Sequence, residues 1–127
     1  FGRIGHRNDA YCTSTGKVLL AFLPTEQLES TLDGWVLTPR TEHTISSVPR
    51  LRRELELVRA RGWADNVNEV EIGVASVAAP IRNASGEVVA AVSAESVYAS
   101  QEEFAAQLRR DRERYGVVIR AAGIRAE

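Results

Sequence analysis

The chain has 127 residues, 44% of them hydrophobic and 26% charged, which is ordinary for one soluble globular domain with a sizeable core. Its formal net charge of -1 gives no general attraction to nucleic acid or to a membrane surface. The single cysteine, Cys12, excludes a disulfide within the chain, and no apolar run approaches the ~20 residues of a membrane-spanning helix. We therefore expect a cytoplasmic protein without a membrane partner. Because residue 1 is Phe, the chain reads as a piece of a longer protein.

The first predicted element is a helix that follows the Thr/Ser-rich stretch CTST and ends before Pro24. Ser14 or Thr15 is expected to cap it, and its body, GKVLLAFL, is apolar on nearly all sides, which predicts burial. A Gly-Lys pair at a helix start suggests a phosphate-binding loop. The spacing argues against that loop, because Tyr11 stands where its first glycine should be and Val18 where its Mg²⁺-binding Ser or Thr should be.

A second, short helix is predicted for Thr25–Leu32, and a polar loop with turn residues follows it. Ser47 is then expected to cap an amphipathic helix that ends at Gly62. Its apolar face consists of Leu51, Leu55 and Val58. The helix should lie on a core, and the arginines of its other face either point to water or form a basic surface for a partner.

A β-hairpin is predicted where two apolar runs flank the turn sequence NASG, in which Gly86 allows a positive φ. One face of its second strand carries Val88, Ala90, Val92 and Ala94, and the other carries Val89, Ala91, Ser93 and Glu95. Both faces are mostly apolar, so both should be covered. A carboxylate on such a face is costly unless it is paired or hydrated. Either the strand reaches solvent at Glu95, or this face lines a cavity with a few polar groups, Ser76 of the first strand among them.

The last predicted element is a long helix that begins at a capping box formed by Ser100 and Glu103. Its apolar stripe starts at Phe104, continues to Ala122 and is interrupted near Asp111. A seam this narrow favours packing against another segment or another subunit.

Taken together, these segments resemble a known family. In order, YCTSTGKVLLAFLP, TPRT, RARGWADNVNEVEIGVASVAAPIRNASGEVVAAVSAES and the closing helix resemble the effector-binding domain of IclR-type bacterial transcriptional regulators. The resemblance covers residues 1–127 and implies an α+β fold with a GAF/PAS-like antiparallel sheet flanked by helices. It also implies that the domain senses a small organic metabolite and controls DNA binding by an N-terminal winged helix-turn-helix. We expect this chain to lack that DNA-binding part and the start of the sensor domain, with residues 1–7 as the strand that leads into the first helix.

The resemblance further implies which residues bind the effector. They lie on the incoming strand, at the start of the Gly-Lys helix, before the Glu-x-Gly sequence and on both hairpin strands: Asn8, Ser14, Thr15, Gly16, Asn66, Val74, Ser76, Ser93 and Glu95. In this interpretation the backbone N–H groups of Ser14, Thr15 and Gly16 face an anionic or carbonyl-bearing ligand. The simpler alternative is that Ser14 only caps the helix and Gly16 only lets the helix approach the sheet. Lys17 either helps to hold an anion or forms a buttressing hydrogen bond.

Two positions depart from the family's pattern. Asn66 stands where many members have Asp, and Glu95 with Ser96-Val97 replaces a Ser-Gly-Pro sequence. A simple acidic metabolite that faced Glu95 would be repelled unless that carboxylate is protonated or paired. The class of effector therefore stays open.

Two other functions also stay open: a ligand-free dimerisation module, and a small enzyme with Cys12 as its nucleophile at a helix start. Neither His6 nor His43 lies in an obvious partner position for a catalytic cysteine, and Val18 excludes a Cys-x5-Arg phosphatase loop. The scattered histidines and cysteine do not predict a metal site. We expect Cys12 to be a small buried residue. The chain is predicted to be no enzyme, to use no cofactor and to self-associate as a dimer or tetramer.

Overall fold

The structure is a computed structural model that describes residues 8–97 and Arg110. The elements, in chain order, are α1 (Ser14–Ala21), α2 (Thr25–Leu32), α3 (Val48–Arg61), β1 (Ala64–Val67), β2 (Val74–Arg82) and β3 (Val88–Val97). Apart from Val97 they all belong to the first of two structural units, Phe1–Ser96. The strand expected at residues 1–7 and the long helix expected at residues 100–122 lie outside the described residues. No helix of the described part is long and apolar enough to cross a membrane.

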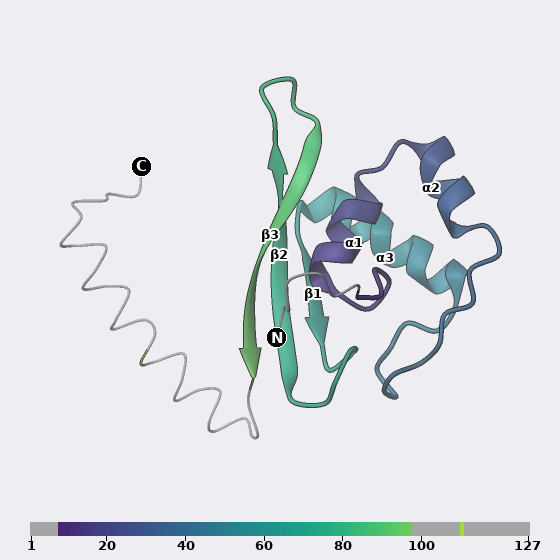
Figure 1. Ribbon diagram of the computed structural model, residues 1–127, viewed down its shortest axis with the longest axis vertical. Helices are drawn as coiled ribbons and strands as arrows, with labels where there is room; N and C mark the ends of the chain where they lie inside the picture. The colour runs from purple at the N-terminus through teal and green to yellow at the C-terminus, as the bar shows by residue number, and fades with distance from the viewer. Residues whose placement is uncertain (1–7, 98–109, 111–127) are drawn as a thin grey trace. The chain divides into compact units, whose positions relative to one another are not determined.

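The three strands form one antiparallel sheet in the order β1-β2-β3 (Figure 1). The hairpin of β2 and β3 was predicted, and it turns at Gly86 with a φ of 82°. The sequence analysis did not predict β1. In the structure it pairs with β2, so that Ala64 lies opposite Ala78 and Asn66 lies opposite Ser76. Within residues 8–97, three helices and an antiparallel sheet confirm the predicted α+β class.

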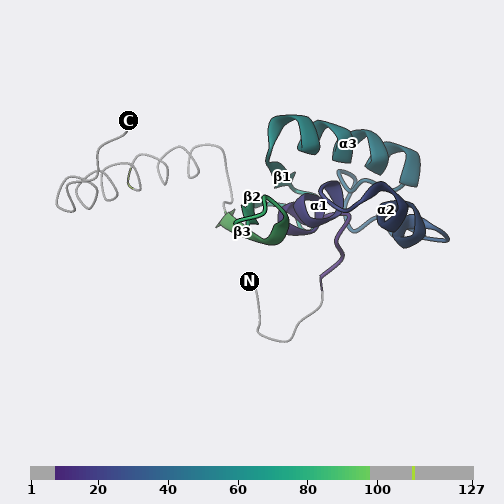
Figure 2. The same cartoon turned by 90° about the horizontal axis from the view of Figure 1, so that it is seen from above.

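The helices cover one face of this sheet (Figures 1 and 2). α1 contacts β1, β2 and α3, which explains why its sequence is apolar on nearly every side. Val18 and Ala21 of α1 are fully buried, and so are Leu51 and Val58 on the predicted apolar face of α3. The hydrophobic core therefore lies between the sheet and the helices, and α1 is at its centre.

Capping accounts for the start of α1 and the end of α3. Thr13 is the N-cap of α1, because its hydroxyl accepts a hydrogen bond from the backbone N–H of Gly16 at 3.3 Å. The prediction that Ser14 or Thr15 caps this helix was wrong by one or two residues. Ser47 does occupy the N-cap position of α3, although its side chain makes no capping hydrogen bond, and Gly62 ends α3 in the left-handed conformation with a φ of 84°.

The second face of the sheet carries apolar side chains that are exposed. Within residues 8–97, Val77 of β2 is 46% exposed and Val92 of β3 is 58% exposed. Both point away from the helices, because side chains alternate between the two faces along a strand. Residues 8–97 therefore cover only the helix-facing side of a sheet that the sequence predicted to be covered on both sides.

Candidate functional site

A cavity of about 210 Å³ lies where the start of α1 meets the hairpin. Side chains from the segment before α1, from α1, from β1 and the loop after it, and from both hairpin strands line it: Asn8, Thr13, Ser14, Thr15, Asn66, Val70, Val74, Ser76, Ser93 and Glu95. All of the site residues expected from the resemblance are in this set except Gly16. The structure thus brings together residues that are up to 87 positions apart in the sequence, from Asn8 to Glu95.

A hydrogen bond between Ser14 and Ser76 joins two walls of the cavity. Their Oγ atoms lie 2.8 Å apart, and Ser14 is only 2% exposed. Ser14 is the first residue of α1 and Ser76 lies on β2, so this bond holds the helix start against the sheet. Ser93 of β3 lines the same cavity, so it lies on the same side of the sheet as Ser14.

Asn66 presents a hydrogen-bond donor to this cavity. Its side chain is buried, and its Oδ1 atom accepts a hydrogen bond from the backbone N–H of Glu69 at 2.9 Å. No other residue among 8–97 accepts a hydrogen bond from its amide nitrogen, which is therefore available to a ligand. An aspartate at position 66 would offer only hydrogen-bond acceptors. Asparagine, which departs from the family's pattern, therefore adds a hydrogen-bond donor to this wall of the cavity.

Gly16 serves packing and does not face the cavity. A Cβ atom at this position would lie 2.4 Å from both the Cα atom and the carbonyl oxygen of Ala10, and 2.6 Å from the Thr13 hydroxyl. Its backbone N–H is already bonded to Thr13. The expectation that this N–H faces a ligand was therefore wrong. Gly16 does permit close packing, but against the turn at Ala10 and not against the sheet, as the alternative had it.

Thr13 and Val70 line the cavity, although the sequence analysis did not name them. Thr13 could have been found from its position in the stretch CTST, because threonine is a preferred N-cap residue. Its hydroxyl donates to the backbone carbonyl of Asp9 at 3.1 Å. Val70 lies between β1 and β2, and no local pattern marks a single apolar loop residue as part of a site.

The chemistry of this cavity suits binding better than catalysis. Its polar groups are hydroxyls and amides, with the exposed Glu95 as the one carboxylate among the described lining residues, so Glu95 both reaches solvent and borders the cavity. Among residues 8–97 and 110, no three His, Cys, Asp or Glu side chains are grouped closely enough to hold a metal ion. Hydroxyls and amides fix the orientation of a small polar ligand.

Lys17 points away from this cavity and forms a buried ion pair. Its Nζ atom lies 2.5 Å from Oε1 of Glu69, and the Lys17 side chain is 1% exposed. Of the two roles left open by the sequence, the structure therefore shows the buttressing one. Burial raises the pKa of Glu69 above its ordinary value, while the hydrogen bond and charge of Lys17 oppose that shift.

Cys12 lacks the environment of a catalytic thiol. It is 1% exposed, and burial, followed by the nearby charge of Asp9, raises the pKa of its thiol. A nucleophilic cysteine needs the opposite shift, because the thiolate is the reactive form. Its Sγ atom donates a weak hydrogen bond to the backbone carbonyl of Asp9 at 3.5 Å. Cys12 thus behaves as the small buried residue that the sequence predicted.

Comparisons with known proteins agree with this architecture. Residues 1–116 match the profile of the family described as bacterial transcriptional regulator IclR C-terminal. The Pca regulon regulatory protein of Pseudomonas putida is 40% identical over 90 residues, which are 71% of this chain and 31% of that protein. The chain spans about a third of the length of the curated relatives it matches.

Solved structures show the same fold. A transcriptional regulator from Rhodococcus sp. RHA1 superposes with a TM-score of 0.74 and 42% sequence identity, over 76% of this chain and 39% of that one. The inducer-binding domain of PobR from Acinetobacter, a double mutant in complex with 3-hydroxybenzoic acid, gives a TM-score of 0.69 and 34% identity over 73% of this chain and 53% of that one. The chain therefore belongs to the family of bacterial transcriptional regulator IclR C-terminal domains.

Proposed function

We propose that this chain is the effector-binding domain of a bacterial transcriptional regulator and that the cavity between α1 and the hairpin is its effector site. The convergence of Ser14, Asn66, Ser76 and Ser93 on one cavity carries this proposal, because separate elements supply these polar groups. The PobR domain, a structural neighbour with a bound aromatic acid, supports it. The cavity is open, whereas a ligand-free dimerisation module would fill this space with side chains.

The proposed effector is a small organic metabolite. A cavity of about 210 Å³ is smaller than the ~300–1,000 Å³ sites that hold drug-sized ligands. A carbonyl or carboxylate oxygen of the effector would accept hydrogen bonds from the start of α1 and from the Asn66 amide. A hydroxyl group of the effector would in turn donate to the Ser76 or Ser93 hydroxyl oxygen.

In the whole protein, we propose that effector binding changes DNA binding by a separate N-terminal domain. KdgR of Escherichia coli, 37% identical over 93 residues, is named as an HTH-type transcriptional regulator, which supports this assignment. Residues 1–127 would then form part of the sensor domain. DNA would be a partner only through that other domain, and the chain itself would have no catalytic role.

We also propose that the chain self-associates as a dimer or tetramer. The exposed apolar side chains of Val77 and Val92 on the second sheet face support this, because such surfaces favour contact with another chain. Light scattering across a dilution series tests it. A stable monomer at micromolar concentration would contradict the proposal.

A thermal-shift screen of this chain against a metabolite library tests the effector site. A ligand at ~100 times its dissociation constant should stabilise the fold by about 2.7 kcal/mol. Ser93→Leu would fill the cavity and should abolish the shift, while the unliganded protein stays folded because Ser93 is exposed. Ser85→Leu, in the exposed hairpin turn away from the cavity, is the matched control and should keep the shift. If the shift survives in Ser93→Leu, the ligand binds elsewhere.

A further inference from the structure

The loop between α2 and α3 is hydrogen-bonded to two parts of the chain that border the cavity between α1 and the hairpin, which we call the effector cavity. None of the described lining residues of that cavity belongs to residues 38–44 of this loop. In the turn before α1, the Tyr11 hydroxyl donates to the backbone carbonyl of Thr38 at 2.7 Å. In the loop after β1, the backbone carbonyl of Glu69 accepts from the Thr44 hydroxyl at 2.6 Å. Residues 38–44 therefore fix how these two parts lie relative to each other.

The hydroxyl of Thr44 is fully used inside the protein. Thr44 is 2% exposed, and its Oγ1 atom accepts hydrogen bonds from the backbone N–H groups of Arg40 at 3.0 Å and Thr41 at 2.9 Å. A hydroxyl has two acceptor positions and one proton. Because both acceptor positions are occupied, the proton is directed to the carbonyl of Glu69. The Thr44 hydroxyl thus holds the backbone of Glu69, and the Thr41 hydroxyl holds the carbonyl of Asn68 at 2.6 Å in the same way.

The backbone of Glu69 determines which way the side-chain amide of Asn66 points. The N–H of Glu69 donates to Oδ1 of Asn66 at 2.9 Å. Since an N–H group only donates, the amide oxygen faces Glu69, and the amide nitrogen then faces the effector cavity that Asn66 lines. Without that N–H, the amide could turn over and present its oxygen to the cavity instead. The donor character of this cavity wall therefore depends on the position of Glu69.

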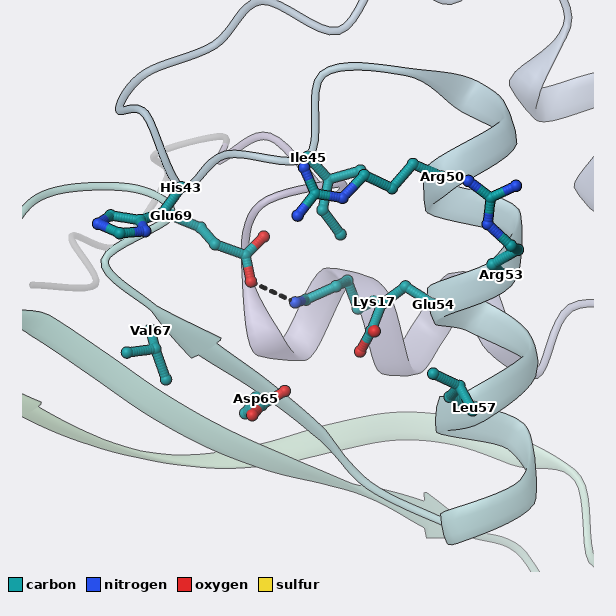
Figure 3. Close-up of a pocket in the computed structure, with 10 residues that line it drawn as sticks. All are labelled: Lys17, His43, Ile45, Arg50, Arg53, Glu54, Leu57, Asp65, Val67 and Glu69. Atoms are coloured by element: carbon teal, nitrogen blue, oxygen red, sulfur yellow. Dashed lines mark hydrogen bonds and ion pairs between the residues drawn. The ribbon is translucent and has the colours of Figure 1, made fainter.

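The ion pair of Glu69 with Lys17 does not by itself fix this N–H. Figure 3 shows the pair beside a second cavity, of about 410 Å³, between α3 and β1. The pair is formed by the carboxylate, which three rotatable bonds separate from the backbone of Glu69. The hydrogen bond from Thr44 acts on the backbone itself, at the carbonyl of the residue whose N–H holds Asn66. Among the described contacts of Glu69, the Thr44 bond is therefore the one that holds its backbone carbonyl.

We propose that Thr44 is a positioning residue of the effector site. It keeps the Asn66 nitrogen directed at the bound effector, so that the site selects an effector with an acceptor oxygen at this place over one with a donor group. This inference rests on the effector function proposed above. It adds a residue that lines no part of the effector cavity and acts on the effector only through Glu69 and Asn66.

Backbone amide exchange, measured by NMR, tests the first step without any ligand. Thr44→Val removes the hydroxyl, so the N–H of Glu69 should exchange about tenfold faster relative to that of the buried Val58, the factor that corresponds to one hydrogen bond. Thr44→Ser keeps the hydroxyl and should keep slow exchange. Thr31→Val is the matched control, because the Thr31 hydroxyl bonds within α2, to the carbonyl of Gln27. Equal acceleration at Glu69 and Val58 would show only a loss of global stability and would overturn the proposal.

The unchanged protein supplies a second check, which holds even if Thr44→Val does not fold. The N–H of Glu69 should exchange more slowly than the same amide in an unstructured peptide, because Asn66 accepts its hydrogen bond. Exchange of Glu69 at the unprotected rate would overturn the proposal.

Titration with acetate, followed through the side-chain amide resonances of Asn66, tests the consequence for binding. Acetate offers only acceptor oxygens and should shift these resonances in the unchanged protein, whereas methylammonium, which offers only donors, should not. The apparent Kd for acetate should rise about tenfold in Thr44→Val and stay the same in Thr44→Ser. An unaltered Kd in Thr44→Val would overturn the proposal. If acetate shifts nothing in any of the proteins while Glu69 exchange responds to Thr44→Val as expected, the positioning of Asn66 stands and the result counts against the effector site instead.

Discussion

Lys17 of α1 and Glu69 of the loop after β1 form a buried ion pair across 52 positions of sequence, with Nζ and Oε1 2.5 Å apart. The same loop is tied to the effector cavity, because the backbone N–H of Glu69 donates to Asn66. Thr44 adds a third link, since its buried hydroxyl donates to the backbone carbonyl of Glu69 at 2.6 Å. The ion pair therefore holds in place the loop behind Asn66, which is one wall of the cavity between α1 and the hairpin.

Lys17→Met should destabilise the fold by about 3 kcal/mol or more at neutral pH, because it leaves the Glu69 carboxylate buried without its cation. Adding Glu69→Gln should restore part of this loss, since the second change removes the unpaired charge. Urea unfolding of the three proteins measures both effects. Arg52→Gln, which breaks the exposed pair with Glu29, should change the unfolding free energy very little. Equal stabilities of Lys17→Met and the unchanged protein would show that the pair does not support the fold.

Glu69 should also make stability depend on pH. Its pKa is raised in the folded state, mainly by burial, so the native protein keeps the proton to a higher pH than the unfolded chain. This contribution to stability is fully present below the ordinary value of 4.5 and is lost as the pH rises through the raised pKa. Compared with Glu69→Gln, the unchanged protein should therefore lose stability as the pH rises from 4.5. Parallel stability curves for the two proteins, from urea unfolding at several pH values, would contradict this.

Gly16→Ala should destabilise the fold by about 1–3 kcal/mol, because the new methyl group would overlap the backbone at Ala10. This cost should exceed the gain of about 1 kcal/mol that alanine brings to a helix interior. The free energy of unfolding is the measurement. Leu19→Ala on the exposed side of the same helix is the control, and its effect should be smaller. A stabilised Gly16→Ala protein would show that the turn before α1 can shift to accommodate the methyl group at little cost in free energy.

The bond between Ser14 and Ser76 can be measured with a double-mutant cycle. Ser14→Ala and Ser76→Ala should be non-additive by about 0.5–1.5 kcal/mol, the usual net contribution of one hydrogen bond. Ser30 lies exposed on α2 and bonds only locally, so a cycle of Ser30→Ala with Ser76→Ala should be additive. Additivity in the first cycle would mean that the helix start is not held to β2 by these hydroxyls.

The sequence by itself predicted every helix and strand within residues 8–97 except β1, and most of the residues that line the cavity between α1 and the hairpin. The apolar α1 segment, the cap at Gly62 and the turn at Gly86 act over a few residues, so local patterns predict them. Ser93 could also be predicted from a local pattern, because the alternation of side chains along the strand places its polar group on a mostly apolar face.

Only the tertiary structure decided which side chains meet and on which faces of α1 the side chains of Ser14 and Lys17 lie. Thr13 caps α1 in place of the predicted Ser14, because the Ser14 hydroxyl forms its hydrogen bond with Ser76, which is distant in sequence. Lys17 lies on the far side of α1 from the effector cavity because Glu69 is packed there, and the short polar sequence of β1 forms a strand only through pairing with β2. Local propensities choose helix or strand, whereas pairing and burial across the chain choose the neighbours.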